Sequence, residues 1–195
     1  MKPEILFYSD FPLGYHNREA EERMARFATR GYRVHYVEQL GMRNPRLGHL
    51  PRLLRTLVGP PGSASDSLPF DVVSPKLLPA RGAPLVDAVN RRWLGRQLAA
   101  RLDDPREAIF WIRYPTRELI PFVTEAAPRL VIYEMVDDHP GAPGMTDRMR
   151  RIFFAAERRI LALAGLVFAS SEPIRARLAC LHPNVVLAPA AAVDL

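Results

Sequence analysis

The chain has one cysteine, Cys180, and only two lysines among its 195 residues. A single cysteine excludes an internal disulfide and a cysteine-rich metal site, and it fits a protein of the reducing cytosol. We expect Cys180 to be buried, because it lies in an apolar helical stretch. The longest apolar runs fall far short of the roughly 18 residues that a membrane-spanning helix requires. The sequence therefore indicates a cytoplasmic protein.

Three common nucleotide-binding and catalytic motifs are also missing. The first predicted strand is followed by FPLGYHN, which has one glycine in place of the G-x-G-x-x-G fingerprint. Neither a G-x-x-x-x-G-K-[ST] loop nor a G-x-S-x-G elbow occurs. These absences disfavour an NAD-linked dehydrogenase, a P-loop phosphate site and an α/β-hydrolase, and we expect no bound cofactor.

The charge is positive, and nearly all of it comes from arginine. The chain has 27 basic and 21 acidic residues, a net charge of +6. Such a balance can attract phosphates, nucleic acid or an anionic membrane. It equally fits a genome rich in Arg, Ala and Pro codons, which would also explain the 19 prolines. Nucleic acid is the least favoured partner, because aromatic residues do not alternate with the basic ones and no recognition motif appears.

Apolar strands alternate with amphipathic stretches along the chain, the pattern of a parallel sheet wrapped by helices. Strands are predicted at 4–10, 32–38, 70–75, 108–115, 129–136, 165–171 and 184–189. Helices are predicted after Asn17 and up to Gly31, at 84–102, near 116–126, at 146–164 and from Glu172. We therefore predict one Rossmann-like three-layer α/β domain over 1–195, with a mostly parallel sheet of six or seven strands.

Polar residues gather where the predicted strands end. In open α/β sheets, ligands bind in the crevice outside the carboxyl ends of the strands. The residues that follow the first, fourth, fifth and sixth strands are Gly14, Tyr15, His16, Asn17 and Arg18; Arg113 and Tyr114; Asp137, Asp138 and His139; and Ser171 and Glu172. We predict that they line a binding crevice.

The segment VIYEMVDDHPG, residues 131–141, allows three interpretations. Asp137, Asp138 and His139 could hold a metal ion, but three consecutive residues do not easily face one ion. Asp138 could instead cap the next turn while His139 stays solvated. In the leading interpretation, the carboxylates accept hydrogen bonds from sugar or amine hydrogens.

The other strand ends also have structural alternatives. Residues 16–18 could be an ordinary helix start with Asn17 as cap, or an anion site at a helix N-terminus. Arg113 needs a partner, either an aspartate of the neighbouring strand or an anionic ligand. Ser171 and Glu172 could simply cap the helix that follows them.

Residues 46–57 place leucines at helical spacing opposite arginines. This stripe could lie on a membrane surface, or it could pack on its own domain. The first alternative predicts a peripheral contact with the inner face of the membrane.

Four segments resemble a known family in order and spacing. They are ILFYSDFPLGYHNREAEERMARFATRGYRVHYVE, RLVIYEMVDDHPG, LALAGLVFASSEPIRARL and NVVLAPAAAVDL. Together they resemble the N-terminal half of GT-B fold glycosyltransferases, in particular the large retaining family that includes many bacterial cell-surface polysaccharide enzymes. There the fifth strand often ends in Y-D-x-x-D-D, and the next helix leads into an aDlVfasS strand.

The resemblance implies a division of labour between two domains. The N-terminal domain would hold a saccharide or lipid-linked acceptor, and a C-terminal domain with an E-x-x-x-x-x-x-x-E motif would hold the nucleotide-sugar donor. No such motif occurs here, so we expect an isolated acceptor domain that transfers no sugar alone. Asp137, Asp138 and His139 would orient acceptor hydroxyls. Residues 16–18 would lie near the acceptor and the donor phosphates, and Arg113 and Tyr114 on the cleft floor.

Two departures from the family pattern stand out. Many members have His-Asp where this chain has Asp137 and Asp138, so no histidine role carries over. Ala191 and Ala192 replace the usual Asn-Gly of the closing segment.

The rival hypotheses are a non-catalytic module that binds saccharide or pairs with a donor-domain subunit, and a small-molecule enzyme that uses the aspartates with a metal.

Overall fold

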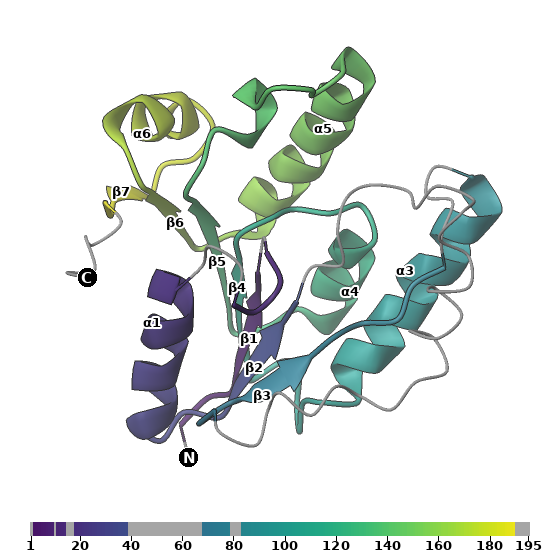
Figure 1. The fold of residues 1–195 in the computed structure, drawn as a ribbon, viewed down its shortest axis with the longest axis vertical. Coiled ribbons are helices and arrows are strands. Elements are labelled where there is room, and N and C mark those ends of the chain that lie inside the picture. The colour runs from purple at the N-terminus through teal and green to yellow at the C-terminus, as the bar shows by residue number, and fades with distance from the viewer. Residues whose placement is uncertain (1, 10, 15–17, 39–67, 79–82, 190–195) are drawn as a thin grey trace.

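The computed structural model describes residues 2–9, 11–14, 18–38, 68–78 and 83–189. Its centre is a sheet of seven strands in the order β3-β2-β1-β4-β5-β6-β7, and every neighbouring pair is parallel. The strands are β1 (Ile5–Tyr8), β2 (Val34–Val37), β3 (Asp71–Val73), β4 (Ile109–Ile112), β5 (Leu130–Met135), β6 (Leu166–Ala169) and β7 (Val185–Leu187). Figure 1 shows the sheet between two layers of helices.

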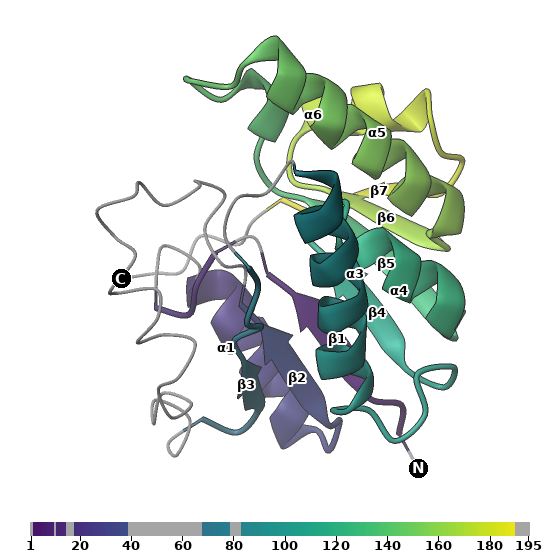
Figure 2. The same cartoon turned by 90° about the vertical axis from the view of Figure 1, so that its right-hand side faces the viewer.

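The helices cover the two faces unequally. They are α1 (Arg18–Thr29), α3 (Pro84–Ala99), α4 (Leu119–Ala126), α5 (Asp147–Leu163) and α6 (Glu172–Ala179). Of these described helices only α1 packs on one face, and the others contribute to the core of the opposite face. Figures 1 and 2 show α1 on one side of the sheet, away from α3, α4 and α5. This is the predicted Rossmann-like three-layer α/β architecture, so the fold class is confirmed.

Each strand is apolar on both faces because both faces are buried. One core cluster contains Leu6, Ile112 and Tyr133, together with residues of α3 to α6. The other contains Phe7 and Trp111, together with residues of α1. The alternation along each strand thus divides its side chains between the two clusters, which sets the register of the parallel pairs.

Local signals account for several helix ends. Gly31 has φ +84°, a left-handed conformation that residues with a Cβ rarely adopt, and it follows the end of α1 as predicted. The Thr146 hydroxyl accepts a hydrogen bond of 3.3 Å from the Met149 N–H and caps α5. The proposed cap Asn17 and the stripe at 46–57 lie outside the described residues.

A buried carboxylate joins α5, α6 and β5. Glu157 is 1% exposed, and its two oxygens accept hydrogen bonds of 2.7 and 2.8 Å from the Arg177 guanidinium. The Tyr133 hydroxyl donates a third hydrogen bond of 2.9 Å to the same carboxylate. Burial, and then the charge of Glu157, hold the pKa of Tyr133 well above its usual value. Three elements are therefore held together by one charged group.

The expectation that Cys180 is buried was wrong. Its thiol is exposed just beyond α6, 3.4 Å from the Ala176 carbonyl oxygen that accepts its hydrogen bond. The reason is that α6 buries only Ile174 and Leu178 against the sheet, so the apolar residues around Cys180 do not cover it.

Among the helices in the described ranges, none combines the length and the apolar character that crossing a bilayer demands.

Candidate functional site

The strand order predicts a ligand crevice at the carboxyl ends of β1 and β4. These two strands are neighbours, and the chain leaves β1 toward α1 on one face and β4 toward α4 on the other. Loops that diverge in this way leave room between them, which is where ligands bind in doubly wound sheets. Among the described residues, Gly14 follows β1, and Arg113 and Tyr114 follow β4 directly.

The loop after β1 is tied down by two carboxylates. The Gly14 N–H donates a hydrogen bond of 2.6 Å to Glu21 Oε1 in α1, and Gly14 has φ +77°. The Leu13 N–H donates one of 2.9 Å to Glu38 Oε1, just after β2. Gly14 thus turns the chain toward α1, a conformation that glycine adopts without strain.

The next predicted residues are only partly visible. Tyr15, His16 and Asn17 lie outside the described residues. Arg18 begins α1 with an exposed side chain, and its Nε lies 3.6 Å from Glu22 Oε1. An exposed ion pair of this kind contributes little stability, so Arg18 can exchange Glu22 for another anion at small cost.

Arg113 lies in a buried charged cluster with α1. Its side chain is 3% exposed, and its Nε lies 3.9 Å from Glu134 Oε2 on the neighbouring strand β5. The same carboxylate accepts a hydrogen bond of 2.8 Å from the Trp111 indole and lies 2.9 Å from Arg23 Nη2. The Arg23 guanidinium also stacks 5.0 Å from the Trp111 ring.

The described carboxylate near Arg113 is therefore Glu134, the last residue but one of β5, and neither of the predicted aspartates. Sequence reasoning missed Glu134 and Arg23. The available signal was a single carboxylate inside the apolar run VIYEMV, beside a strand that ends in arginine. A buried charge of this kind needs an opposite charge nearby.

Tyr114 and His139 meet on the face of the sheet that α3, α4, α5 and α6 cover. Their rings pack edge to face with centroids 5.0 Å apart, and Phe153 of α5 contacts both rings. Burial raises the pKa of Tyr114 to about 12, with a smaller contribution from Tyr8 at the end of β1. The phenol therefore stays protonated at neutral pH and can donate a hydrogen bond.

Asp137 and Asp138 are exposed, as solvated carboxylates should be. The His139 N–H donates a hydrogen bond of 2.8 Å to the Asp137 carbonyl, and the short 3-10 helix η2 (His139–Gly141) begins here. The Asp138 side chain makes no capping hydrogen bond, but it lies against Gly141, where any Cβ would collide with its carboxylate. Gly141 therefore leaves room for one orientation of Asp138.

No group of three or more potential metal ligands exists within the described ranges.

Ser171 and Glu172 occupy the start of α6. Ser171 is the N-cap by backbone conformation, but its hydroxyl makes no capping hydrogen bond. Glu172 forms an exposed ion pair with Arg175, which lowers the pKa of Glu172. The structure thus places Ser171 and Glu172 where a helix start was predicted, and it brings Tyr114 and His139 into contact. Arg113 faces the opposite side of the sheet, with Trp111.

Comparisons with known proteins bear on the fold. No protein-family model matches the sequence, and no curated protein matches it. Among solved structures, a glycosyltransferase from Rickettsia africae ESF-5 superposes with a TM-score of 0.52 at 12% sequence identity. The match covers 96% of this chain. The chain shares its fold with a glycosyltransferase.

The superposition covers 43% of the Rickettsia chain, so this chain spans less than half of that protein's length. At such low identity the likeness concerns the backbone arrangement alone. Individual site residues cannot be transferred from it, and the roles given above depend on their own geometry.

Proposed function

We propose that this chain is the acceptor-binding domain of a GT-B glycosyltransferase. The complete enzyme would move a sugar from a nucleotide-diphosphate donor to a saccharide or lipid-linked acceptor. The observation that carries the proposal is the superposition of nearly the whole chain on under half of a glycosyltransferase. In this proposal a second domain supplies the groups that bind the donor diphosphate, and the 195 residues alone transfer no sugar.

The crevice offers groups suited to a hydroxyl-rich acceptor. The Asp137 and Asp138 carboxylates are exposed acceptors of hydrogen bonds, and Tyr114 is a protonated donor at neutral pH. The half-buried ring of His139, which packs edge to face on the buried Tyr114, provides an apolar surface against which a sugar ring can pack. In this proposal the aspartates orient acceptor hydroxyls, and residues 16–18 lie near the acceptor and the donor phosphates.

Among the described residues, part of one sheet face is incompletely covered, which supports a second domain. A parallel sheet normally has helices on both faces. On the α1 face, the neighbouring strands β6 and β7 present Leu166 and Phe168, both half-buried, and Val186, which is 46% exposed. We propose that another domain covers this strip, either in the same polypeptide or in a separate donor-binding subunit, which is the alternative function.

Peripheral membrane contact belongs to the same proposal. Leu85, Val89 and Trp93 recur at four-residue intervals on α3, and they are 79%, 43% and 40% exposed. Such a stripe on an arginine-rich helix suits the interfacial region of a bilayer. Replacing Leu85 and Trp93 with serine should reduce flotation of the protein with anionic vesicles, and unchanged flotation would contradict the contact.

The decisive experiment combines the mass of the native gene product with an activity assay. The chain has a mass of 22.0 kDa, and a native product about twice that size would fit the two-domain proposal. That product should release nucleoside diphosphate from one member of a nucleotide-sugar panel when an acceptor is present. A native product of 22.0 kDa that binds saccharide without turnover would favour the alternative.

The role of the aspartates has its own test in the active protein. Asp138→Asn keeps the size of the side chain and removes its charge, so turnover should fall while the fold is retained. Asp147→Asn, an exposed aspartate in the first turn of α5, is the matched control. Unchanged turnover in Asp138→Asn would remove this residue from the site.

A further inference from the structure

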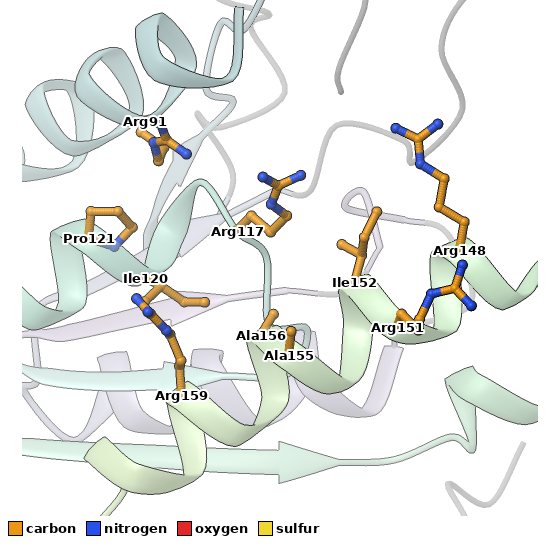
Figure 3. Close-up of a pocket in the computed structure, with 10 residues that line it drawn as sticks. All are labelled: Arg91, Arg117, Ile120, Pro121, Arg148, Arg151, Ile152, Ala155, Ala156 and Arg159. Atoms are coloured by element: carbon orange, nitrogen blue, oxygen red, sulfur yellow. The ribbon is translucent and has the colours of Figure 1, made fainter. Parts of the chain in front are cut away.

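A groove lies on the outer side of the helix layer, between α3 and α5. Its volume is about 730 Å³, and its walls come from α3, the segment before α4, α4 itself and α5 (Figure 3). The groove exists because α4 has 8 residues, whereas its neighbours α3 and α5 have 16 and 17. At about 1.5 Å per residue, α4 is shorter than its neighbours by roughly 12 Å.

Five arginines line the groove, and none of its lining residues is acidic. They are Arg91, Arg117, Arg148, Arg151 and Arg159 (Figure 3). Within the described part of the chain, one carboxylate pairs with this set: Asp87 Oδ2 lies 3.5 Å from Arg117 Nη1. The other four guanidiniums form no ion pair with a described carboxylate.

The arginines on α5 form a pattern along the helix. Arg148, Arg151 and Arg159 share one side of α5 with Ala155, at spacings of three, four and four residues. Because the Ala155 side chain is short, it leaves space in this row between the longer arginine side chains. Between them, Ile120, Pro121 and Ile152 give the groove an apolar lining.

The positive charges of the guanidiniums repel one another, and an anion bound between them reduces this repulsion. Arginine suits phosphate better than a point charge does, because its planar guanidinium donates two parallel hydrogen bonds. Elsewhere in the chain, Arg177 and Arg23 are each matched by a buried carboxylate. Apart from Arg117, which pairs with Asp87, the groove arginines have no described carboxylate partner, so their charge is available to an anionic ligand.

We propose that the groove binds a ligand with two or more phosphate groups attached to an apolar part. The guanidiniums would take the phosphates, and the isoleucines and Pro121 would contact the apolar part. None of the residues that line the groove is one of the residues assigned to the proposed acceptor crevice, so the groove is additional to that crevice. The phosphates could belong to a free organic diphosphate or to lipid headgroups, which present the same chemistry.

The test uses inorganic diphosphate as the probe, with calorimetric titration of the 195-residue chain at constant ionic strength. Diphosphate should bind with one-to-one stoichiometry and more tightly than sulfate. Arg148→Gln and Arg159→Gln should each weaken binding roughly tenfold or more, the loss expected for one charge-assisted contact. Arg158→Gln is the matched control, because Arg158 is an exposed arginine of α5 that does not line the groove.

Vesicles distinguish the two sources of phosphate. Phosphatidylcholine vesicles with and without phosphatidylglycerol are tested with the same variants. Diphosphate binding that the groove variants weaken supports a free ligand. Vesicle binding that Arg148→Gln and Arg159→Gln weaken, but Arg158→Gln does not, supports a lipid headgroup as the ligand. The proposal is overturned if neither probe binds, or if Arg158→Gln weakens binding as much as Arg148→Gln and Arg159→Gln do. Because no sugar transfer is measured, this outcome is independent of the proposed transferase activity.

Discussion

The core and the groove use arginine in opposite ways. In the core, Glu157 and Glu134 are almost completely buried, and each lies within 3 Å of an arginine nitrogen. In the groove, five arginines surround a solvent-filled space whose lining contains no carboxylate. The first arrangement stabilises the fold, whereas the second leaves charge available for a ligand. An arginine-rich composition therefore has no single meaning, and the pairing of each guanidinium decides its role.

The largest effect is expected from replacing Glu157, the more deeply buried of the two core carboxylates. Glu157→Gln leaves Arg177 without its ion pair and weakens the contact to Tyr133. We expect a loss of about 3–5 kcal/mol in the free energy of unfolding, as for other broken buried pairs. Urea denaturation measures this loss, and Glu125→Gln, a substitution of an exposed glutamate, is the control. Equal stability of the two variants would show that Glu157 is dispensable.

Removing the second core carboxylate should have a smaller effect. Glu134→Gln keeps an acceptor for the Trp111 indole but loses the charge beside Arg23 and Arg113. Arg23 is partly exposed and still has Glu19 at 2.9 Å, so a loss of about 2–3 kcal/mol is expected. Thermal unfolding measures this loss. A loss of stability as large as that of Glu157→Gln would contradict the expectation that Glu157 contributes more to stability than Glu134.

Alkaline pH tests the burial of the crevice tyrosine. The pKa of Tyr114 is raised from 10.0 to about 12 in the folded protein. Below about pH 10 the folded and the unfolded chain both keep the Tyr114 proton, so Tyr114 contributes no pH dependence to the stability. Between about pH 10 and 12 the unfolded chain loses a proton that the folded chain keeps, so stability falls as the pH rises.

The expected loss from Tyr114 over this range is at most about 2 kcal/mol. Tyr114→Phe removes that contribution, while the similarly buried Tyr133 keeps its own. The decline of stability above pH 10 should therefore be shallower in the variant. Parallel curves for the two proteins would mean that Tyr114 ionises normally.

The smallest effect is expected in the groove. Arg148→Gln and Arg159→Gln replace exposed side chains that have no described carboxylate partner, so unfolding free energy should change by no more than about 0.5 kcal/mol. A slight increase in stability is expected at low salt, where repulsion among the guanidiniums is least screened. Denaturation at two salt concentrations measures both effects. A loss above 1 kcal/mol would give these arginines a structural role.

The sequence was a good guide to the fold because local and tertiary preferences agree. Runs such as EILFYSD and RLVIYEMV are apolar on both faces, which only a covered parallel strand requires. Gly31 ends a helix because, without a Cβ, it adopts positive φ easily, and the Thr146 hydroxyl caps the start of another. Periodicity could not foresee that α6 leaves Cys180 exposed, since that depends on what lies beside the last helix.

The candidate site was only partly predictable. Strand ends are visible in a sequence, so Arg113, Tyr114 and His139 could be selected in advance. Which of them meet is decided by the alternation along β4, which sends Arg113 toward Trp111 and Tyr114 toward His139. The pairing of Glu134 with Arg23 joins residues far apart in the chain, and no local signal encodes it. The groove likewise follows from the relative lengths of three helices.

The all-parallel sheet also has a consequence for how the chain folds. Its first strand β1 pairs with β2 on one side and with β4 on the other, where Ile5 lies beside Ile109. No hairpin contributes to the sheet, so each strand pair requires a long crossover to close first. During synthesis, the first three strands would emerge well before β4 exists to cover the inner edge of β1. We therefore expect slow folding, and a nascent half-sheet whose open edge needs protection from other chains until the middle of the protein has been made.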